Sequence, residues 1–184
     1  MQMTIINGIP DNSYKEFEDS LNKTAKSLSS QNEIDIYRVR DMDFHNCIGC
    51  FSCWVRTPGK CIFDDDMTGV LKKTYSSDLL IYVSPVSAGF LTSETKKAME
   101  RFLPLMLPYI DIYKKECHHL PRYEMHYKMG LILIRKNVVD LKSRRYIYDI
   151  FDRLAINMRI NVPFKRTVTS GELGEVLKHE ALYS

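Results

Sequence analysis

Short apolar runs alternate along the chain with longer segments whose apolar residues recur every three or four positions. Residues 78–83 and 129–134 are almost continuously apolar, which is typical of strands buried on both faces of a parallel sheet. Residues 3–7, 33–39 and 161–167 are shorter or less regular strand candidates. The sequence therefore predicts five strands.

Segments with helical periodicity separate these runs. In the first of them, Phe17, Leu21 and Ala25 fall on one face. Predicted helices cover residues 14–28, the segment from Met67 to Tyr75, and residues 93–103, 142–158 and 172–182. Strands that alternate with helices in this order predict an α/β protein with a doubly wound parallel sheet and helices on both faces.

Two segments interrupt the alternation, and we expect both to belong to one domain that spans residues 1–184. Residues 44–63 form a cysteine-rich loop, and residues 104–128 form an excursion that we expect to be partly helical. The excursion carries Tyr109, Tyr113, Tyr123 and Tyr127, which suggest an aromatic surface for a partner subunit in a homodimer or homotetramer. The strand at 78–83 is predicted to break at Ser84–Pro85.

The acidic run Asp64–Asp66 precedes a predicted helix, and its interpretation is open between a helix cap and a cation site. Acidic residues in a first helical turn complement the helix dipole, so the cap is favoured.

Composition narrows the possible partners and the compartment. The net charge of +3 comes without a dense Lys/Arg stripe, so we expect no nucleic-acid partner. No apolar run approaches the roughly 18 residues that a membrane span needs. The first residues lack the basic and apolar regions of a signal peptide, so we expect a cytoplasmic protein.

Four of the five cysteines, Cys47, Cys50, Cys53 and Cys61, follow the spacing C-x2-C-x2-C-x7-C. A reducing compartment disfavours structural disulfides, which leaves an iron–sulfur cluster, a zinc site or free thiols with a packing or redox role. Three close cysteines and one more distant cysteine favour a [4Fe–4S] cluster over zinc, which more often takes two spaced pairs of ligands.

The predicted topology also locates a ligand crevice. In a doubly wound sheet, ligands bind beyond the carboxyl ends of the strands, where residues 8–13, 41–63, 84–92 and 135–141 connect strands to helices. The cysteines are therefore expected beside this crevice. A dinucleotide-binding Gly-x-Gly-x-x-Gly fingerprint and a Walker loop are absent from the sequence.

Three motifs carry a resemblance to a known family. They are Asn7-Gly8-Ile9-Pro10 after the first strand, the cysteine run followed by Asp65-Asp66-Met67, and Ser84-Pro85-Val86 with Gly89-Phe90, Lys96-Lys97 and Arg101 behind it. With these motifs the chain resembles the flavodoxin-like NAD(P)H-dependent FMN reductases, and among them the iron–sulfur flavoproteins. The resemblance implies a flavodoxin-like fold with a five-stranded parallel sheet.

The same resemblance implies a function. It is that of an FMN-dependent oxidoreductase, with NAD(P)H as co-substrate or a protein as electron donor, and with an unknown small-molecule or protein acceptor. The residues that would bind FMN are Asn12, Ser13, Ser84, Pro85, Val86, Ser87, Gly89 and Phe90, and a [4Fe–4S] cluster would be held by Cys47, Cys50, Cys53 and Cys61. The sequence identifies no catalytic acid or base.

The first loop departs from the family pattern. Ile9 stands at a hydroxyl position and Asp11 where a basic residue is common. An alternative is therefore a flavodoxin-like module that has lost FMN and serves as a metal-binding or assembly protein.

Overall fold

The computed structural model describes residues 1–136 and 140–183. Within them, five parallel strands form a sheet in the order β2-β1-β3-β7-β8. The strands are β1 (Gln2–Asn7), β2 (Glu33–Arg38), β3 (Leu79–Ser87), β7 (Lys128–Ile134) and β8 (Lys165–Val168). This is the order of flavodoxin-like folds, so the predicted fold class is confirmed.

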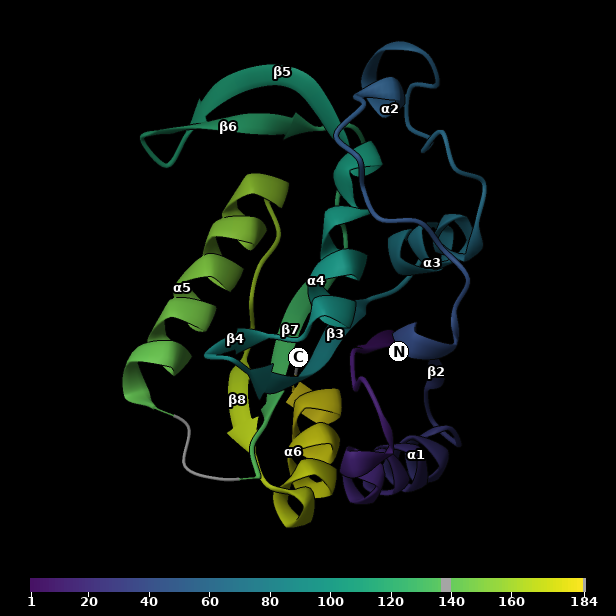
Figure 1. Ribbon diagram of the computed structural model, residues 1–184, viewed down its shortest axis with the longest axis vertical. Helices are drawn as coiled ribbons and strands as arrows, with labels where there is room; N and C mark the ends of the chain where they lie inside the picture. Colours follow the sequence, from purple (N-terminus) through teal and green to yellow (C-terminus); the bar gives the residue numbers. More distant parts are fainter. Residues whose placement is uncertain (137–139, 184) are drawn as a thin grey trace.

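Helices cover both faces of the sheet (Figure 1). One face carries α1 (Lys15–Leu28) and α6 (Ser170–Tyr183), and the other carries α3 (Asp66–Tyr75), α4 (Ser93–Glu100) and α5 (Leu141–Met158). The central strands β3 and β7 contribute to a separate buried core on each face, which explains their continuous apolar sequences. Among the described residues, none of the helices combines the length and the apolar character needed to cross a membrane.

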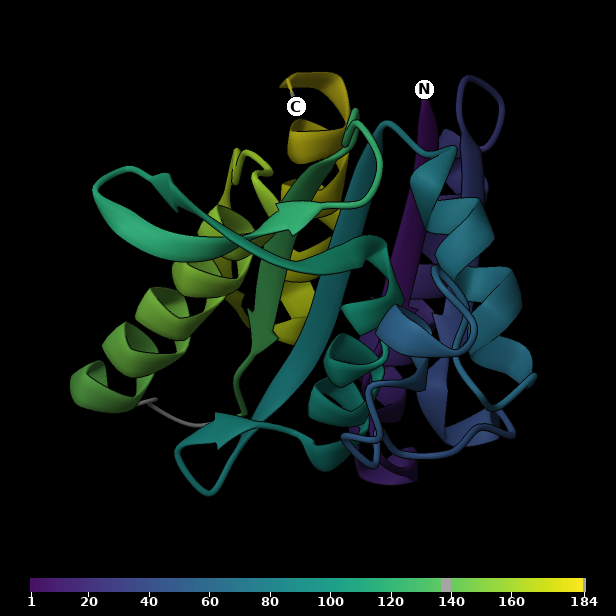
Figure 2. The same cartoon turned by 90° about the horizontal axis from the view of Figure 1, so that it is seen from above.

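An additional layer lies above α3, α4 and α5, on the side away from the sheet (Figures 1 and 2). It consists of the hairpin β5 (Met106–Tyr113) and β6 (Glu116–Pro121) and the short helix α2 (Ser52–Val55). The expectation of a partly helical excursion was wrong beyond the 3-10 turn η3 (Leu103–Leu105). Its prolines are tolerated because each strand of a two-stranded ribbon has one free edge.

The predicted strand break at Ser84–Pro85 was also wrong. β3 continues through Pro85 to Ser87, where it turns into the short antiparallel strand β4 (Phe90–Leu91). β1 has ended by then, because its last residue Asn7 pairs with Val83. Pro85 pairs with Ile134 of β7. The missing N–H of Pro85 therefore interrupts no hydrogen bond between β3 and β1.

The acidic run before α3 acts as the predicted helix cap. The side chain of Asp65 accepts a hydrogen bond from the backbone N of Met67 at 3.2 Å. Two further 3-10 turns follow strands at the carboxyl edge of the sheet, η1 (Asn12–Tyr14) after β1 and η2 (Val39–Asp41) after β2.

Polar contacts attach the hairpin to α5. Glu116 of β6 accepts from Arg153 at 2.5 Å and lies 3.0 Å from Nε2 of His118. The neighbouring backbone N of His119 donates to the side chain of Asn157 at 3.3 Å. Hydrogen bonds from Arg153 and then His118 lower the pKa of Glu116 to about 2.

This shift predicts that acid loosens the hairpin. Because the folded pKa of Glu116 lies below its ordinary value of 4.5, its contribution is complete above pH 4.5 and is lost as the pH falls toward 2. We expect β6 amides to exchange hydrogen faster, relative to α6 amides, at pH 3 than at pH 7. Glu116→Gln should show the faster exchange already at pH 7. Glu175→Gln, which removes an exposed partner of Lys178 only, is the control. A wild-type acid response in Glu116→Gln would contradict this role.

Candidate functional site

The loop after β1 packs directly on the first turn of α4. Thr92 caps α4 by accepting from the backbone N of Thr95 at 3.3 Å, and its hydroxyl donates to the carbonyl of Gly8 at 2.7 Å. A Cβ at Gly8 would lie 1.8 Å from Oγ1 of Thr95. Glycine is therefore required here, and the contact joins two of the predicted ligand loops.

The loop after β1 contains a hydrogen bond between its own exposed carboxylate and a backbone N–H. The side chain of Asp11 accepts from the backbone N of Ser13 at 2.7 Å. Hydrogen bonds from the side chain and the backbone of Ser13 lower the pKa of Asp11. Asn12 and Ser13 are exposed, and Oδ1 of Asn12 is 3.5 Å from Nη2 of Arg40. Asp11 thus occupies a backbone N–H that a phosphate loop would offer to its ligand.

Basic residues that the sequence analysis missed lie beside the loop after β1, at the carboxyl edge of the sheet. Asn12 and Ser13 line a cleft of about 530 Å³ together with Lys15, Arg135 and Lys136, and Glu16, Thr169 and Ser170 line the same cleft. Its three cations outnumber the carboxylate of Glu16, which suits a phosphate group. A signal was available, because Arg135 and Lys136 are adjacent basic residues directly after a buried strand.

Lys136 also touches the loop after β1. Its Nζ donates to the backbone carbonyl of Ser13 and lies 4.0 Å from the ring centroid of Tyr14. The positive charge of Lys136 therefore stands close to the exposed carboxylate of Asp11, whose pKa it also lowers.

The second predicted flavin loop divides into an inner and an outer part. Ser84 and Pro85 are buried, and Oγ of Ser84 accepts from the backbone N of Thr92 at 3.1 Å. These two residues hold the loop together. Val86 and Phe90 are half-buried, and Ser87 and Gly89 are exposed at the tip.

The tip itself is a two-residue turn with a backbone that glycine favours. Ala88 has φ 49° and Gly89 has φ 79°, as in the hairpin turns that match the twist of the flanking strands. A Cβ at Gly89 would lie 3.1 Å from Oγ of Ser143, so the tip contacts the first turn of α5.

All four cysteines of the motif line one narrow cavity outside α4. Their apolar companions there are Ile48, Phe51, Ile62, Phe63, Leu103 and Pro104. Cys53 is buried and Cys50 is exposed. Burial raises the pKa of the Cys53 thiol, whereas hydrogen bonds from the side chain and the backbone of Ser52 lower the pKa of the Cys50 thiol. The structure thus brings together residues that the sequence grouped by spacing alone.

The hairpin layer holds the cysteine segment in place. Nε1 of Trp54 donates to the carbonyl of Met106 at 2.9 Å, and the Trp54 ring packs on His119 with centroids 4.9 Å apart. Arg122, just after β6, donates from Nη2 to the carbonyl of Cys53 at 3.3 Å and from Nε to the carbonyl of Pro104 at 3.0 Å.

An ion pair lies beneath the same segment. Arg101 donates from Nη1 and Nη2 to the two carboxylate oxygens of Asp65 at 2.7 and 2.8 Å, and Nη1 also donates to the carbonyl of His45 at 2.7 Å. Burial acts to lower the pKa of Arg101, but Asp65, Cys61 and Cys47 raise it overall. The resemblance assigned Arg101 to the helix behind a flavin loop, whereas the structure places it at the cysteine cavity.

The four thiols of the motif share one cavity. Within the described part of the chain, no three His, Cys, Asp or Glu side chains are placed to hold one metal ion. Zinc needs its ligands to converge on one point, whereas a [4Fe–4S] cluster takes its four thiolates around a volume. The cavity holds about 20 Å³, room for about one water molecule, so a cluster requires the exposed side of the loop to open.

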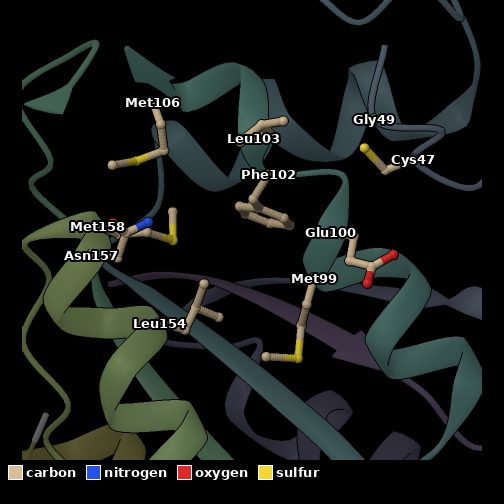
Figure 3. A pocket seen from close by; sticks show the side chains of 10 residues that line it. All are labelled: Cys47, Gly49, Met99, Glu100, Phe102, Leu103, Met106, Leu154, Asn157 and Met158. Atoms are coloured by element: carbon tan, nitrogen blue, oxygen red, sulfur yellow. The ribbon is translucent and has the colours of Figure 1, made fainter. Parts of the chain in front are cut away.

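Cys47 adjoins two larger cavities as well. One, of about 550 Å³, is shared with Arg40 and with Ser93 at the start of α4, so Cys47 adjoins a cavity near the carboxyl edge of the sheet. The other holds about 400 Å³ beneath the hairpin (Figure 3). Figure 3 shows Cys47 and Glu100 on one side and Asn157 on the other, with the apolar side chains Met99, Phe102, Leu103, Met106, Leu154 and Met158 around the space between them. Its size suits a small organic molecule.

Comparisons with known proteins agree with this architecture. No family model matches the chain. An iron–sulfur flavoprotein from Methanocaldococcus jannaschii is 35% identical over 75 residues, which make up 41% of this chain and 38% of that protein. The chain therefore matches well under two thirds of that relative's length.

Solved structures resemble the chain along its length. An FMN-dependent NADH-azoreductase from Bacillus anthracis in complex with FMN has a TM-score of 0.61 at 14% identity, covering 98% of this chain and 100% of that one. An NADH:FMN oxidoreductase in its apo form has a TM-score of 0.59 at 13% identity, covering 98% of this chain and 88% of that one. The chain thus resembles an iron–sulfur flavoprotein in part of its sequence and has the flavodoxin-like fold of FMN reductases.

The two hydrogen bonds of Thr92 lead to a prediction about the stability of the protein. Thr92→Val removes the cap of α4 and leaves the carbonyl of Gly8 without its donor in a buried place. We expect a loss of about 1–3 kcal/mol in the free energy of unfolding, measured by urea denaturation. The neighbouring exposed Ser93→Ala should change it by less than about 0.5 kcal/mol. Equal losses in the two variants would contradict the role given to Thr92.

Proposed function

We propose that this chain is a flavin-dependent oxidoreductase that moves electrons between NAD(P)H, or a protein donor, and an acceptor, with FMN at the carboxyl edge of the sheet and a [4Fe–4S] cluster at the cysteine cavity. The observation that carries the proposal is the gathering of Cys47, Cys50, Cys53 and Cys61 around one cavity on a flavodoxin-like sheet. The partial likeness to an iron–sulfur flavoprotein supports it.

The residues that would hold FMN come from three loops. Lys15, Arg135 and Lys136, with Ser13, offer cations and a hydroxyl for the phosphate group. Ser87 and Gly89 offer an exposed backbone turn to the ring, with Val86 and Phe90 beside it. Ser84 and Pro85 act from within by fixing this turn against α4.

The thiols that would hold a cluster share their cavity with apolar side chains. Ile48, Phe51, Ile62 and Phe63 line it, and the first three are also exposed to solvent. Bound FMN would supply two-electron chemistry with NAD(P)H, and a bound cluster would supply one-electron chemistry. The apolar cavity under the hairpin gives a small-molecule acceptor a place beside Cys47.

One domain, a cytoplasmic location and a homo-oligomer remain predictions. Exposed side chains of β5, Tyr109, Ile110 and Ile112, are compatible with association through the hairpin. Tyr127 is buried in this chain, so it cannot belong to such a surface as the sequence analysis suggested.

FMN binding is tested by titrating the apo-protein with FMN and following the quenching of flavin fluorescence. We expect one FMN per chain. Asp11→Ser should tighten binding about threefold to tenfold because it removes a negative charge near the phosphate, and Lys136→Met should weaken it by a similar factor. Asp19→Ser, which removes an exposed charge on α1, is the control.

The absence of quenching would contradict FMN binding. It would support the alternative of a module that has lost FMN, which the hydrogen bond from Ser13 to Asp11 favours. In that case Asp11→Ser would leave the fluorescence unchanged as well.

The cluster is tested by anaerobic reconstitution with iron and sulfide. We expect a broad brown absorption and about four iron atoms per chain. Cys53→Ser should lose most of both, because it removes one of four thiolate ligands. Cys117→Ser removes the remaining cysteine, which is exposed on β6, and should behave as the wild type. One zinc per chain without iron uptake would favour the zinc site instead.

A further inference from the structure

One donor atom of Arg101, Nε, has no hydrogen-bond partner among the described residues. Its side chain is only 1% exposed, and its two Nη atoms are engaged by Asp65 and by the carbonyl of His45. The remaining donor, Nε, is buried and lacks a hydrogen-bond partner among the described residues. Buried donors without a partner are rare and costly, so this one calls for a physical reason.

The surroundings of Arg101 supply a reason. Arg101 lines the narrow cavity together with all four cysteines, and its charge interacts with sulfur at Cys61 and Cys47. The carboxylate of Asp65 holds both Nη atoms of the guanidinium with two short hydrogen bonds. Arg101 is therefore fixed in a cavity that it shares with the thiols, while its Nε–H has no partner among the described residues.

We propose that Arg101 is a positioning residue for the cysteine-held cluster, which donates its Nε–H to a sulfur there and places a buried positive charge beside it. The proposal rests on the [4Fe–4S] cluster of the proposed function. Reduction adds one electron, and hence one negative charge, without a change in atoms. A neighbouring cation and a hydrogen bond to sulfur both favour the reduced form and raise the reduction potential. Asp65 acts in the opposite direction, because its negative charge partly offsets that of Arg101.

The experiment compares midpoint potentials of reconstituted proteins, titrated with dithionite as reductant and followed by electron paramagnetic resonance. Arg101→Lys keeps the charge and loses the Nε donor, so the potential should become more negative. Asp65→Asn keeps the cap of α3 and removes a negative charge, so the potential should become less negative. Lys178→Met removes an exposed positive charge from α6, on the other face of the sheet, and should leave the potential unchanged.

A second readout follows retention of the cluster. Arg101→Lys should lose iron to a chelator about tenfold faster than the wild type, as expected when a partner of the ligand sulfurs is removed. Lys178→Met should lose iron at the wild-type rate.

The possible outcomes distinguish a failure of this inference from a failure of the proposed function on which it rests. Shifts of opposite sign in Arg101→Lys and Asp65→Asn, with none in Lys178→Met, support the proposal. Shifts of the same sign, no shift in Arg101→Lys, or an equal shift in Lys178→Met would overturn it, because a merely structural ion pair predicts those results. Wild-type protein that takes up neither iron nor sulfide would overturn the cluster itself, and this role of Arg101 with it.

Discussion

The buried pair of Asp65 and Arg101 fixes the part of the chain that carries the cysteines. Asp65 accepts from the backbone N of Met67 at the start of α3 and of His45 in the loop, and from both Nη atoms of Arg101 after α4. One carboxylate thus ties three segments together. Desolvating such a pair is costly, and removing one partner would leave an unpaired buried charge, at a cost of about 3–5 kcal/mol. Burial acts to raise the pKa of Asp65, but hydrogen bonds from Arg101 and His45 lower it overall. The pair therefore remains charged.

A second set of contacts holds the other side of the cysteine segment, and it comes from the hairpin. Trp54 of α2 donates to the carbonyl of Met106 at the start of β5. Arg122 donates to the carbonyl of Cys53 in α2 and to that of Pro104, just before β5. The fold therefore adds a layer to the flavodoxin-like sheet, and this layer holds the cysteine segment from outside. The cavity around the thiols is lined by the cysteine segment itself, by the end of α4 and by η3. The proposed FMN site thus lies on the sheet, whereas the added layer packs on the segment that carries the cysteines.

The sequence predicts the sheet well because its strands and helices have local signals. Continuous apolar runs at 78–83 and 129–134 identify strands that are buried on both faces. The hairpin has no such signal, because its stabilising contacts are with α5 and α2, far away in sequence. Pro85 misled the prediction for a related reason. Its tolerance depends on where β1 ends, which only the register of the sheet reveals.

The candidate site likewise combines residues with a local sequence signal and residues whose role depends on tertiary packing. Spacing alone grouped the four cysteines, because three of them lie within one short segment. The role of Arg101 depends on the tertiary packing of α4 against the loop. A basic residue beside the apolar positions Ala98, Met99 and Phe102 was the available signal.

α4 joins the two candidate sites physically. Thr92 at its start contacts Gly8 at the carboxyl edge, and Arg101 after its end lies under the cysteines. Its eight residues span about 12 Å. A module that had lost FMN would still need the second contact to order its thiols. The cationic cleft beside Ser13 is lined by no residue of α4, so α4 joins the cysteines to the loop after β1 through Thr92 and Gly8 and does not itself form the cleft.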